Sequence, residues 1–250
     1  MLPLLTDLQM SLDPARLFRV ATGAAPDPWQ AEALRSAAPR VLLNCSRQSG
    51  KSLVSAVCAL HAALYQPSSL VLLLSPTLRQ SQELFKKCIG AYRALAETAP
   101  TEAESALRLE LENGSRIVSL PGTETTIRGY SGVALLIIDE AARVPDDLYF
   151  AVRPMLAVSG GRLLLLSTPF GQRGFFYEAW RADEAWERYE VPATMCPRIS
   201  AAFLEEERRA IGAWWFDQEY LCQFRDTIDQ VFSTADIEAA IDPTVAPLEW

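Results

Sequence analysis

The segment from Cys45 to Ser52 reads CSRQSGKS and contains residue types that bind phosphate. An apolar run precedes it and an Ala- and Leu-rich stretch follows it, so it predicts a loop between a strand and a helix. In such a loop, backbone N–H groups surround phosphate oxygens, Lys51 reaches the β and γ phosphates, and the Ser52 hydroxyl ligates Mg²⁺. Cys45 replaces the first glycine of the strict motif; a chance Gly-Lys-Ser tripeptide is the alternative that the context opposes. The predicted ATP-binding loop comprises Ser46, Arg47, Gln48, Ser49, Gly50, Lys51 and Ser52.

Two neighbouring acids, Asp139 and Glu140, end the apolar strand in VALLIIDEAA, which begins at Val133. A carboxylate at the end of a parallel strand near the phosphate loop can hold Mg²⁺, and we assign that role to Asp139. The adjacent Glu140 is expected to polarise the attacking water as the general base. A solvated strand edge is the alternative, and it requires the phosphate-loop motif to be accidental too. Together the two motifs predict ATP hydrolysis with Mg²⁺.

Two further features are expected at the same site. Ser167, Thr168 and Pro169 end the apolar run LLLL, where hydroxyls could sense the γ-phosphate and couple the site to a moving segment. A turn that only terminates a strand is the alternative. Upstream, the amide of Gln30 in PDPWQ can donate to and accept from the adenine edge. Its alternative is a solvated neighbour of a core residue, Trp29.

The spacing of apolar runs indicates the elements that position these residues. Runs at 41–43, 70–74, 133–138 and 163–166 are apolar throughout and are separated by lengths that fit helices. This pattern predicts an α/β fold, a P-loop NTPase with a mostly parallel sheet flanked by helices. Alternating residues around Asn113-Gly114, within 106–120, predict an added antiparallel hairpin. We expect an ATPase core over 1–195 and a small helical subdomain or linker arm over 196–250.

Composition excludes several classes of protein. The 250 residues are 50% hydrophobic and 22% charged, which is ordinary for a globular domain. Five cysteines without a C-x-x-C pair indicate neither a disulfide framework nor a zinc site. No apolar run is long enough for a membrane span, and Asp7 stands where a signal peptide would be basic. The net charge of −8 gives nucleic-acid binding no support by itself.

The motifs PDPWQ, SRQSGKS, LSPTLRQSQELF, IRGYSG with LLIIDEAA, and LLLLSTPFG span about residues 25–232. This set resembles the ATPase domain of the large terminase subunit of tailed double-stranded DNA bacteriophages, an ASCE-class, RecA-like fold. The resemblance implies a motor that uses ATP to drive double-stranded DNA into a procapsid. It also implies a ring of subunits, expected to be a pentamer, on the portal protein, with a small terminase subunit as partner, in the cytoplasm of the infected host. The family's nuclease domain is absent from this chain, so we expect no nuclease activity.

The same resemblance assigns roles to individual residues. It implies adenine binding for Gln30, phosphate sensing for Arg47 and coupling for Ser167-Thr168-Pro169. A ring motor also needs an arginine finger from the neighbouring subunit, and we assign it to Arg128 in a Gly-flanked loop. An ordinary surface arginine is the alternative there, and three rivals stay open: Arg143, Arg153 and Arg173.

The sequence says little about the DNA contact. Arg79, Lys86 and Arg93 recur every seven residues with Lys87 beside them, so they share a helix face that could follow phosphates. A solvated face, with Glu83 paired to Lys87, is the interpretation we favour. The single histidine, His61, lies in an apolar stretch and is expected to pack within a helix.

Two other functions fit parts of the pattern. A superfamily 2 helicase-like translocase shares these motifs but requires a second ATPase lobe, and no second P-loop-like sheet follows residue 170. A non-motor, ATP-dependent assembly switch would not need the base Glu140.

Overall fold

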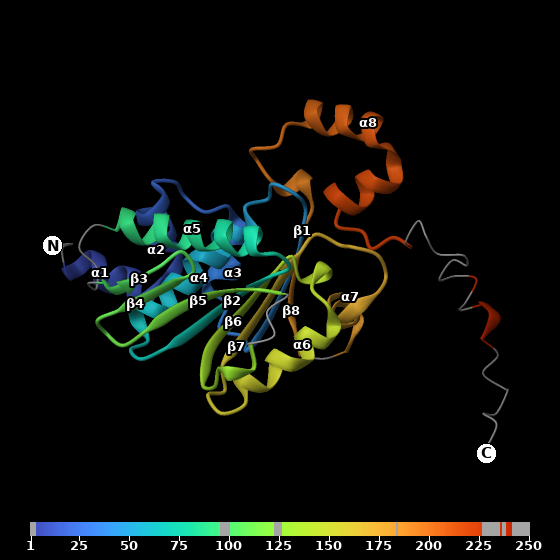
Figure 1. Cartoon of the computed structure of the whole chain (residues 1–250). Coiled ribbons are helices and arrows are strands. Elements are labelled where there is room, and N and C mark those ends of the chain that lie inside the picture. Colours follow the sequence, from blue (N-terminus) through green and yellow to red (C-terminus); the bar gives the residue numbers. More distant parts are fainter. Residues whose placement is uncertain are drawn as a thin grey trace, which may run out of the picture.

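The computed structural model describes residues 4–95, 101–122, 127–183, 185–226, 236 and 239–241. An eight-stranded sheet forms its centre, in the order β3-β4-β5-β2-β6-β7-β1-β8 (Figure 1). The strands are β1 (Arg40–Cys45), β2 (Leu70–Ser75), β3 (Thr101–Glu104), β4 (Arg108–Leu111), β5 (Arg116–Pro121), β6 (Val133–Asp139), β7 (Arg162–Ser167) and β8 (Glu187–Val191).

Helices cover both faces of this sheet. The α-helices are α1 (Leu4–Leu12), α2 (Pro14–Thr22), α3 (Pro28–Arg35), α4 (Lys51–Tyr65), α5 (Leu78–Ala94), α6 (Asp146–Val152), α7 (Gly174–Arg181) and α8 (Ala201–Tyr220). Short 3₁₀ helices lie at η1 (Ile127–Gly129), η2 (Ala141–Arg143), η3 (Arg153–Leu156) and η4 (Ala193–Met195). None of the described helices is both long and apolar enough to cross a lipid bilayer.

Pairing in the sheet confirms the predicted parallel core with an added hairpin. β1 pairs in parallel with β7 and β8, β6 with β2 and β7, and β2 with β5. β4 runs antiparallel to β5 through the turn at Asn113 and Gly114, and β3 extends this ribbon. Parallel pairing brings the carboxyl ends of β1, β6 and β7 to one edge of the sheet. The phosphate loop, the two acids and the hydroxyl residues predicted from the sequence follow these three strand ends.

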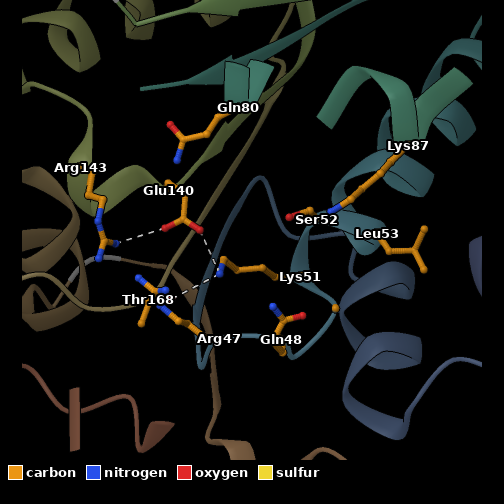
Figure 2. Close-up of a pocket in the computed structure, with 11 residues that line it drawn as sticks. Arg47, Gln48, Lys51, Ser52, Leu53, Gln80, Lys87, Glu140, Arg143 and Thr168 are labelled. Atoms are coloured by element: carbon orange, nitrogen blue, oxygen red, sulfur yellow. Dashed lines mark hydrogen bonds and ion pairs between the residues drawn. The ribbon is translucent and has the colours of Figure 1, made fainter. Parts of the chain in front are cut away.

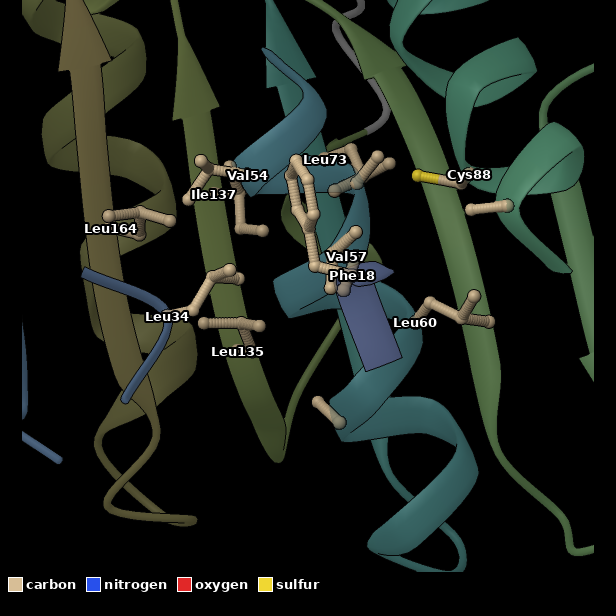
Figure 3. Packing of buried hydrophobic residues seen from close by; sticks show 14 of the residues in the cluster. Phe18, Leu34, Val54, Val57, Leu60, Leu73, Cys88, Leu135, Ile137 and Leu164 are labelled. Carbon is tan, nitrogen blue, oxygen red and sulfur yellow. The ribbon is translucent and has the colours of Figure 1, made fainter. Parts of the chain in front are cut away.

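The apolar runs are continuous because the central strands β1, β2, β6 and β7 are buried on both faces. In β2, Val71 and Leu73 pack in the cluster beneath α2, α4 and α5, whereas Leu72 and Leu74 pack in the cluster beneath α6 and α7. Figure 3 shows the first cluster, where Phe18 lies against side chains of the sheet and of α4. This alternation along one strand explains why consecutive residues in the central strands are apolar.

The helical arm leaves the sheet after β8 and η4. Its helix α8 begins at the N-cap Ser200, whose hydroxyl accepts from the Phe203 N–H, and kinks at Gly212, where φ is 79° and ψ is 161°. Leu204, Phe216 and Tyr220 form a small apolar cluster with Ala193. The predicted helical segment after residue 195 is therefore present, next to the carboxyl edge of β1 (Figure 1).

Candidate nucleotide-binding and catalytic site

The loop between β1 and α4 leaves the helix N-terminus open. The N-cap is Gly50, with φ 95°, and no side-chain oxygen caps the first N–H groups of α4. The loop backbone is held from outside, because the Ser46 N–H donates to the Val191 carbonyl (2.9 Å) and the Arg47 N–H to the Glu219 carbonyl (3.0 Å). The loop therefore holds a fixed path into the N-terminus of α4, a helix end that can bind an anion.

Glu140 and Thr168 line one cavity of about 420 Å³ together with five residues of the predicted loop, Arg47, Gln48, Gly50, Lys51 and Ser52. Lys51 Nζ lies 3.1 Å from Glu140 Oε1 and 3.3 Å from Thr168 Oγ1 (Figure 2). The Ser52 hydroxyl lies 3.4 Å from Asp139 Oδ2. Three strand ends therefore converge on the N-terminus of α4, as the sequence predicted for β1, β6 and β7.

Burial and neighbouring charges shift the pKa of Asp139 and of Lys51. Burial, followed by the nearby Glu140 charge, raises the pKa of Asp139 to about 6. For Lys51, burial lowers the pKa, but the Glu140 and Asp139 carboxylates outweigh it and the net direction is upward. The site is thus arranged around a retained ammonium, and Asp139 gains most from a cation beside it.

The donor set at Ser52 and Asp139 suits Mg²⁺. Both supply oxygen, the element this ion prefers, and they converge at one point of the cavity. Within the described residues, no group of three or more His, Cys, Asp or Glu side chains could hold a metal without other ligands. Mg²⁺ at this position would therefore depend on phosphate oxygens and water as its remaining ligands.

Replacing Asp139 by Asn is expected to stabilise the fold in Mg²⁺-free, nucleotide-free buffer at pH 8. The folded pKa of about 6 exceeds the ordinary 3.8, so the folded carboxyl resists ionisation and stability falls as pH rises between these values. Two pKa units correspond to about 3 kcal/mol in the free energy of unfolding at pH 8. Urea unfolding from pH 4 to 8 measures this, and a gain that is equally large at pH 4 would contradict it.

Glu140 has a strained backbone, with φ 51° and ψ 42°. A non-glycine residue in the left-handed region costs of order 1 kcal/mol or more and is concentrated at functional sites. Its carboxylate is held from two sides, by Lys51 and by Arg143, whose Nη1 lies 3.3 Å from Glu140 Oε2. The backbone turn and the two cations together fix the predicted base over the cavity.

The ion pairs continue from the site into the helical arm. Glu219 of α8, with 10% of its side chain exposed, pairs with Arg47 of the phosphate loop and with Arg143 at 3.6 Å. Arg47, predicted as a phosphate sensor, thus lies at the cavity rim with its guanidinium on Glu219. Arg143 joins this acid to Glu140. Glu219 is not predictable from the sequence, because a helical pattern alone does not distinguish this buried acid from exposed ones.

The predicted coupling segment contacts both the site and the arm. Thr168 accepts from Lys51, and the Ser167 hydroxyl donates to the Thr168 carbonyl at 2.7 Å. Past Pro169, the Gly171 N–H donates to the buried Gln218 amide oxygen of α8 at 3.3 Å. Movement of this loop would therefore alter its contacts with Lys51 and with α8 at the same time.

Gln30 lies beside the phosphate loop but is partly engaged. Its Oε1 accepts from the Asp27 N–H at 2.9 Å, and the side chain is 2% exposed. A Cβ at Gly50 would stand 2.7 Å from Gln30 Nε2, so the amide nitrogen packs against the loop. Adenine recognition by Gln30 stays a prediction, with Nε2 as the atom nearest the loop.

The arginine-finger assignment is not tested by the structure. The backbone of Arg128 belongs to η1, and its side chain lies outside the described residues. All three rivals contact aromatic rings: Arg153 lies 5.6 Å from the Tyr149 ring centre, and Arg143 and Arg173 lie 4.6 and 5.7 Å from that of Phe170. Arg143 contacts Glu140 of its own chain.

The basic stripe on α5 differs from the expected pairing. Glu83 pairs with Lys86 at 2.9 Å and not with Lys87, while Arg93 pairs with Glu104 at 2.7 Å. Lys87 instead lines the cavity near Ser52 (Figure 2). His61 packs in α4 as predicted, with Nε2 3.1 Å from the Ser11 carbonyl.

Comparisons with known proteins agree with this geometry. The family described as terminase large subunit, T4likevirus-type, N-terminal, matches residues 42–239. The large terminase subunit of Thermus virus P23-45 is 32% identical, over 90% of this chain and 54% of its own length. That of Escherichia phage T5 is 28% identical, over 76% of this chain and 44% of its own length. The chain therefore spans about half the length of these curated relatives.

Solved structures show the same fold. The large terminase ATPase domain of Thermus phage P74-26 has a TM-score of 0.74 and 25% identity, covering 85% of this chain and 99% of that one. The large terminase of a thermophilic bacteriophage, solved with ATP-γ-S, has a TM-score of 0.64, 14% identity and coverages of 79% and 52%. Since the family match covers most of the chain and a relative above 30% identity covers 90% of it, this chain belongs to the family of terminase large subunit N-terminal domains.

Proposed function

We propose that this chain is the ATPase domain of a motor that packages viral double-stranded DNA into a procapsid. The observation that carries the proposal is the meeting of Lys51, Ser52 and Glu140 in one cavity at the N-terminus of α4, with Asp139 next to Ser52. The P74-26 relative is an ATPase domain, and the large terminase of the thermophilic bacteriophage binds ADP and ATP-γ-S, which supports ATP as the substrate.

On this proposal, each residue of the site has a defined role. The N–H groups at the start of α4 and the Lys51 ammonium bind the β and γ phosphates. When bound, Mg²⁺ supplies charge neutralisation at the phosphates, held by Ser52 and Asp139. Glu140 accepts the proton of the attacking water at a carboxylate oxygen, after Lys51 or Arg143 releases that oxygen. Ser167, Thr168 and Pro169 transmit the change to α8 through the loop that contacts Gln218.

The motor assignment implies partners that the proposal includes. They are double-stranded DNA, a portal protein on a procapsid, a small terminase subunit and further copies of the chain in a ring, in the cytoplasm of an infected bacterium. The contacts of Glu219 with Arg47 and Arg143 support a link between the nucleotide site and the rest of a motor. A ring of five and the absence of nuclease activity stay predictions.

Two assays test this function. The chain should release phosphate from Mg-ATP and, added with ATP to procapsids that carry the portal protein, should protect double-stranded DNA from nuclease. Arg35→Ala, which alters an exposed residue paired with Asp13, is the matched control and should keep both activities. ATP hydrolysis without DNA protection would contradict the motor and favour an assembly switch.

The Arg128 assignment predicts complementation between variants. Arg128→Ala and Glu140→Gln subunits should each be inactive alone, whereas an equal mixture should regain up to roughly a quarter of the wild-type turnover per subunit. That fraction follows because one interface in four joins an intact finger to an intact base. Mixing either variant with the Arg128→Ala, Glu140→Gln double variant is the control, and absence of recovery at every ratio removes Arg128 as the trans finger.

A further inference from the structure

Arg198 lies at the root of the helical arm and bridges two elements beside the nucleotide site. Its Nη1 donates to Asp27 Oδ1 at 2.9 Å, and its Nη2 donates to Asp27 Oδ2 at 2.8 Å and to the Ser49 carbonyl oxygen at 3.0 Å. The Asp27 side chain is 9% exposed, so this bidentate pair is anchored in a largely buried acid. A guanidinium is thereby held rigidly against the backbone of the phosphate loop.

The bonded carbonyl belongs to the peptide that joins Ser49 to Gly50. A trans peptide is planar, and its C=O and N–H point in opposite directions, so fixing the Ser49 oxygen also fixes the direction of the Gly50 N–H. This N–H stands at the N-cap of α4, where the loop surrounds an anion. The contact with Arg198 therefore determines on which side of the loop the Gly50 N–H is presented.

The Ser49–Gly50 peptide could rotate if no hydrogen bond held its carbonyl oxygen. Gly50 has φ 95°, and glycine also accepts the opposite sign of φ at little cost. The preceding Gln48 is itself in the left-handed region, with φ 59°. Gln30 Nε2 and Arg198 Nη2 both lie close to the position of a Gly50 Cβ, at 2.7 and 3.5 Å. Arg198 supplies the hydrogen bond that selects one of the two peptide orientations.

We propose that Arg198 is a positioning residue that locks the Ser49–Gly50 peptide with its N–H toward the nucleotide phosphates. The proposal rests on nucleotide binding at this site, as set out above. Arg198 acts on a phosphate that ADP and ATP share, not on the γ-phosphate or on Glu140. Its loss should weaken both nucleotides equally and leave the chemical step intact.

The test compares Arg198→Ala with a matched control, Arg35→Ala. Arg35 makes the same kind of bidentate pair, with Asp13 at 2.9 and 2.8 Å, and touches no residue of the cavity. We expect Arg198→Ala to raise the Kd for Mg-ADP and the KM for Mg-ATP by roughly tenfold or more, with kcat within about twofold of wild type. Arg198→Lys, which retains one donor for the Ser49 carbonyl, should recover part of the affinity, and Arg35→Ala should change neither constant.

The outcomes separate this proposal from the function on which it rests. If wild type binds Mg-ADP and Arg198→Ala binds it with the same Kd, the positioning role is wrong while the proposed function stands. A fall in kcat at unchanged KM would also overturn it, because the effect would then lie at the γ-phosphate. If wild type binds no nucleotide, the proposed function itself fails.

Discussion

Replacing Glu140 by Gln is expected to lower Mg-ATP turnover by roughly a hundred- to ten-thousandfold while nucleotide still binds. The amide keeps the size of the side chain, and its oxygen can still accept from Lys51 or Arg143, which lie 3.1 and 3.3 Å from the carboxylate. It cannot accept a proton from water. Removal of a negative charge from the cavity also favours the binding of an anionic ligand. Phosphate release in a single turnover, together with the Kd for ATP-γ-S, measures both effects.

A matched control for this variant is Glu83→Gln, which alters an exposed acid paired with Lys86 on α5. It should hydrolyse ATP at the wild-type rate. Turnover by Glu140→Gln at the wild-type rate would show that another group takes the proton. A loss of ATP-γ-S binding equal to the loss of turnover would show that Glu140 shapes the cavity and is not the base.

Replacing Lys51 by Ala is expected to raise the Kd for Mg-ADP and Mg-ATP by roughly a hundredfold or more. The ammonium is the buried cation of the cavity, 7% exposed, and hydrogen bonds to charged groups in such surroundings contribute about 1.5–3 kcal/mol each. Its removal leaves Asp139 and Glu140 with less compensating charge, so the empty site also becomes more negative. Titration calorimetry with Mg-ADP gives the affinity directly.

Lys51→Met separates the charge of this residue from its packing, since Met keeps most of the length of the lysine side chain and lacks the ammonium. It should bind Mg-ADP as weakly as Lys51→Ala. Lys86→Ala, on the exposed side of α5, should bind like wild type. Wild-type affinity in Lys51→Met would mean that the helix N-terminus binds phosphate without the lysine.

Much of the site follows from local patterns. The strand before the phosphate loop, the helix from Lys51 and the acids at the end of β6 were predicted because each combines an apolar run with a short motif. The hairpin followed from Asn113-Gly114. Their meeting at one edge follows from parallel pairing, which double-sided burial of these strands already favours.

Other parts of the site depend on contacts that leave no periodic signal. β8 is an edge strand with charged, half-buried residues, ERYEV, and lacks the continuous apolar run of the central strands. Glu219 and Arg198 contact the phosphate loop although each lies more than 140 positions from its partner in the sequence. From the sequence alone, their side chains resemble solvated surface charges. Glu83 pairs with Lys86 and not with the expected Lys87, and residue spacing alone does not determine which of the two is its partner.

The central claim is that this chain hydrolyses ATP at a site completed between subunits. Mg-ATP turnover per subunit, measured across protein concentration with Lys51→Ala as the blank, tests it most directly. We predict turnover above the blank that rises with concentration as subunits supply Arg128 to one another. Turnover above the blank that is flat with concentration would contradict the shared site, and turnover no higher than the blank at every concentration would contradict catalysis by this chain.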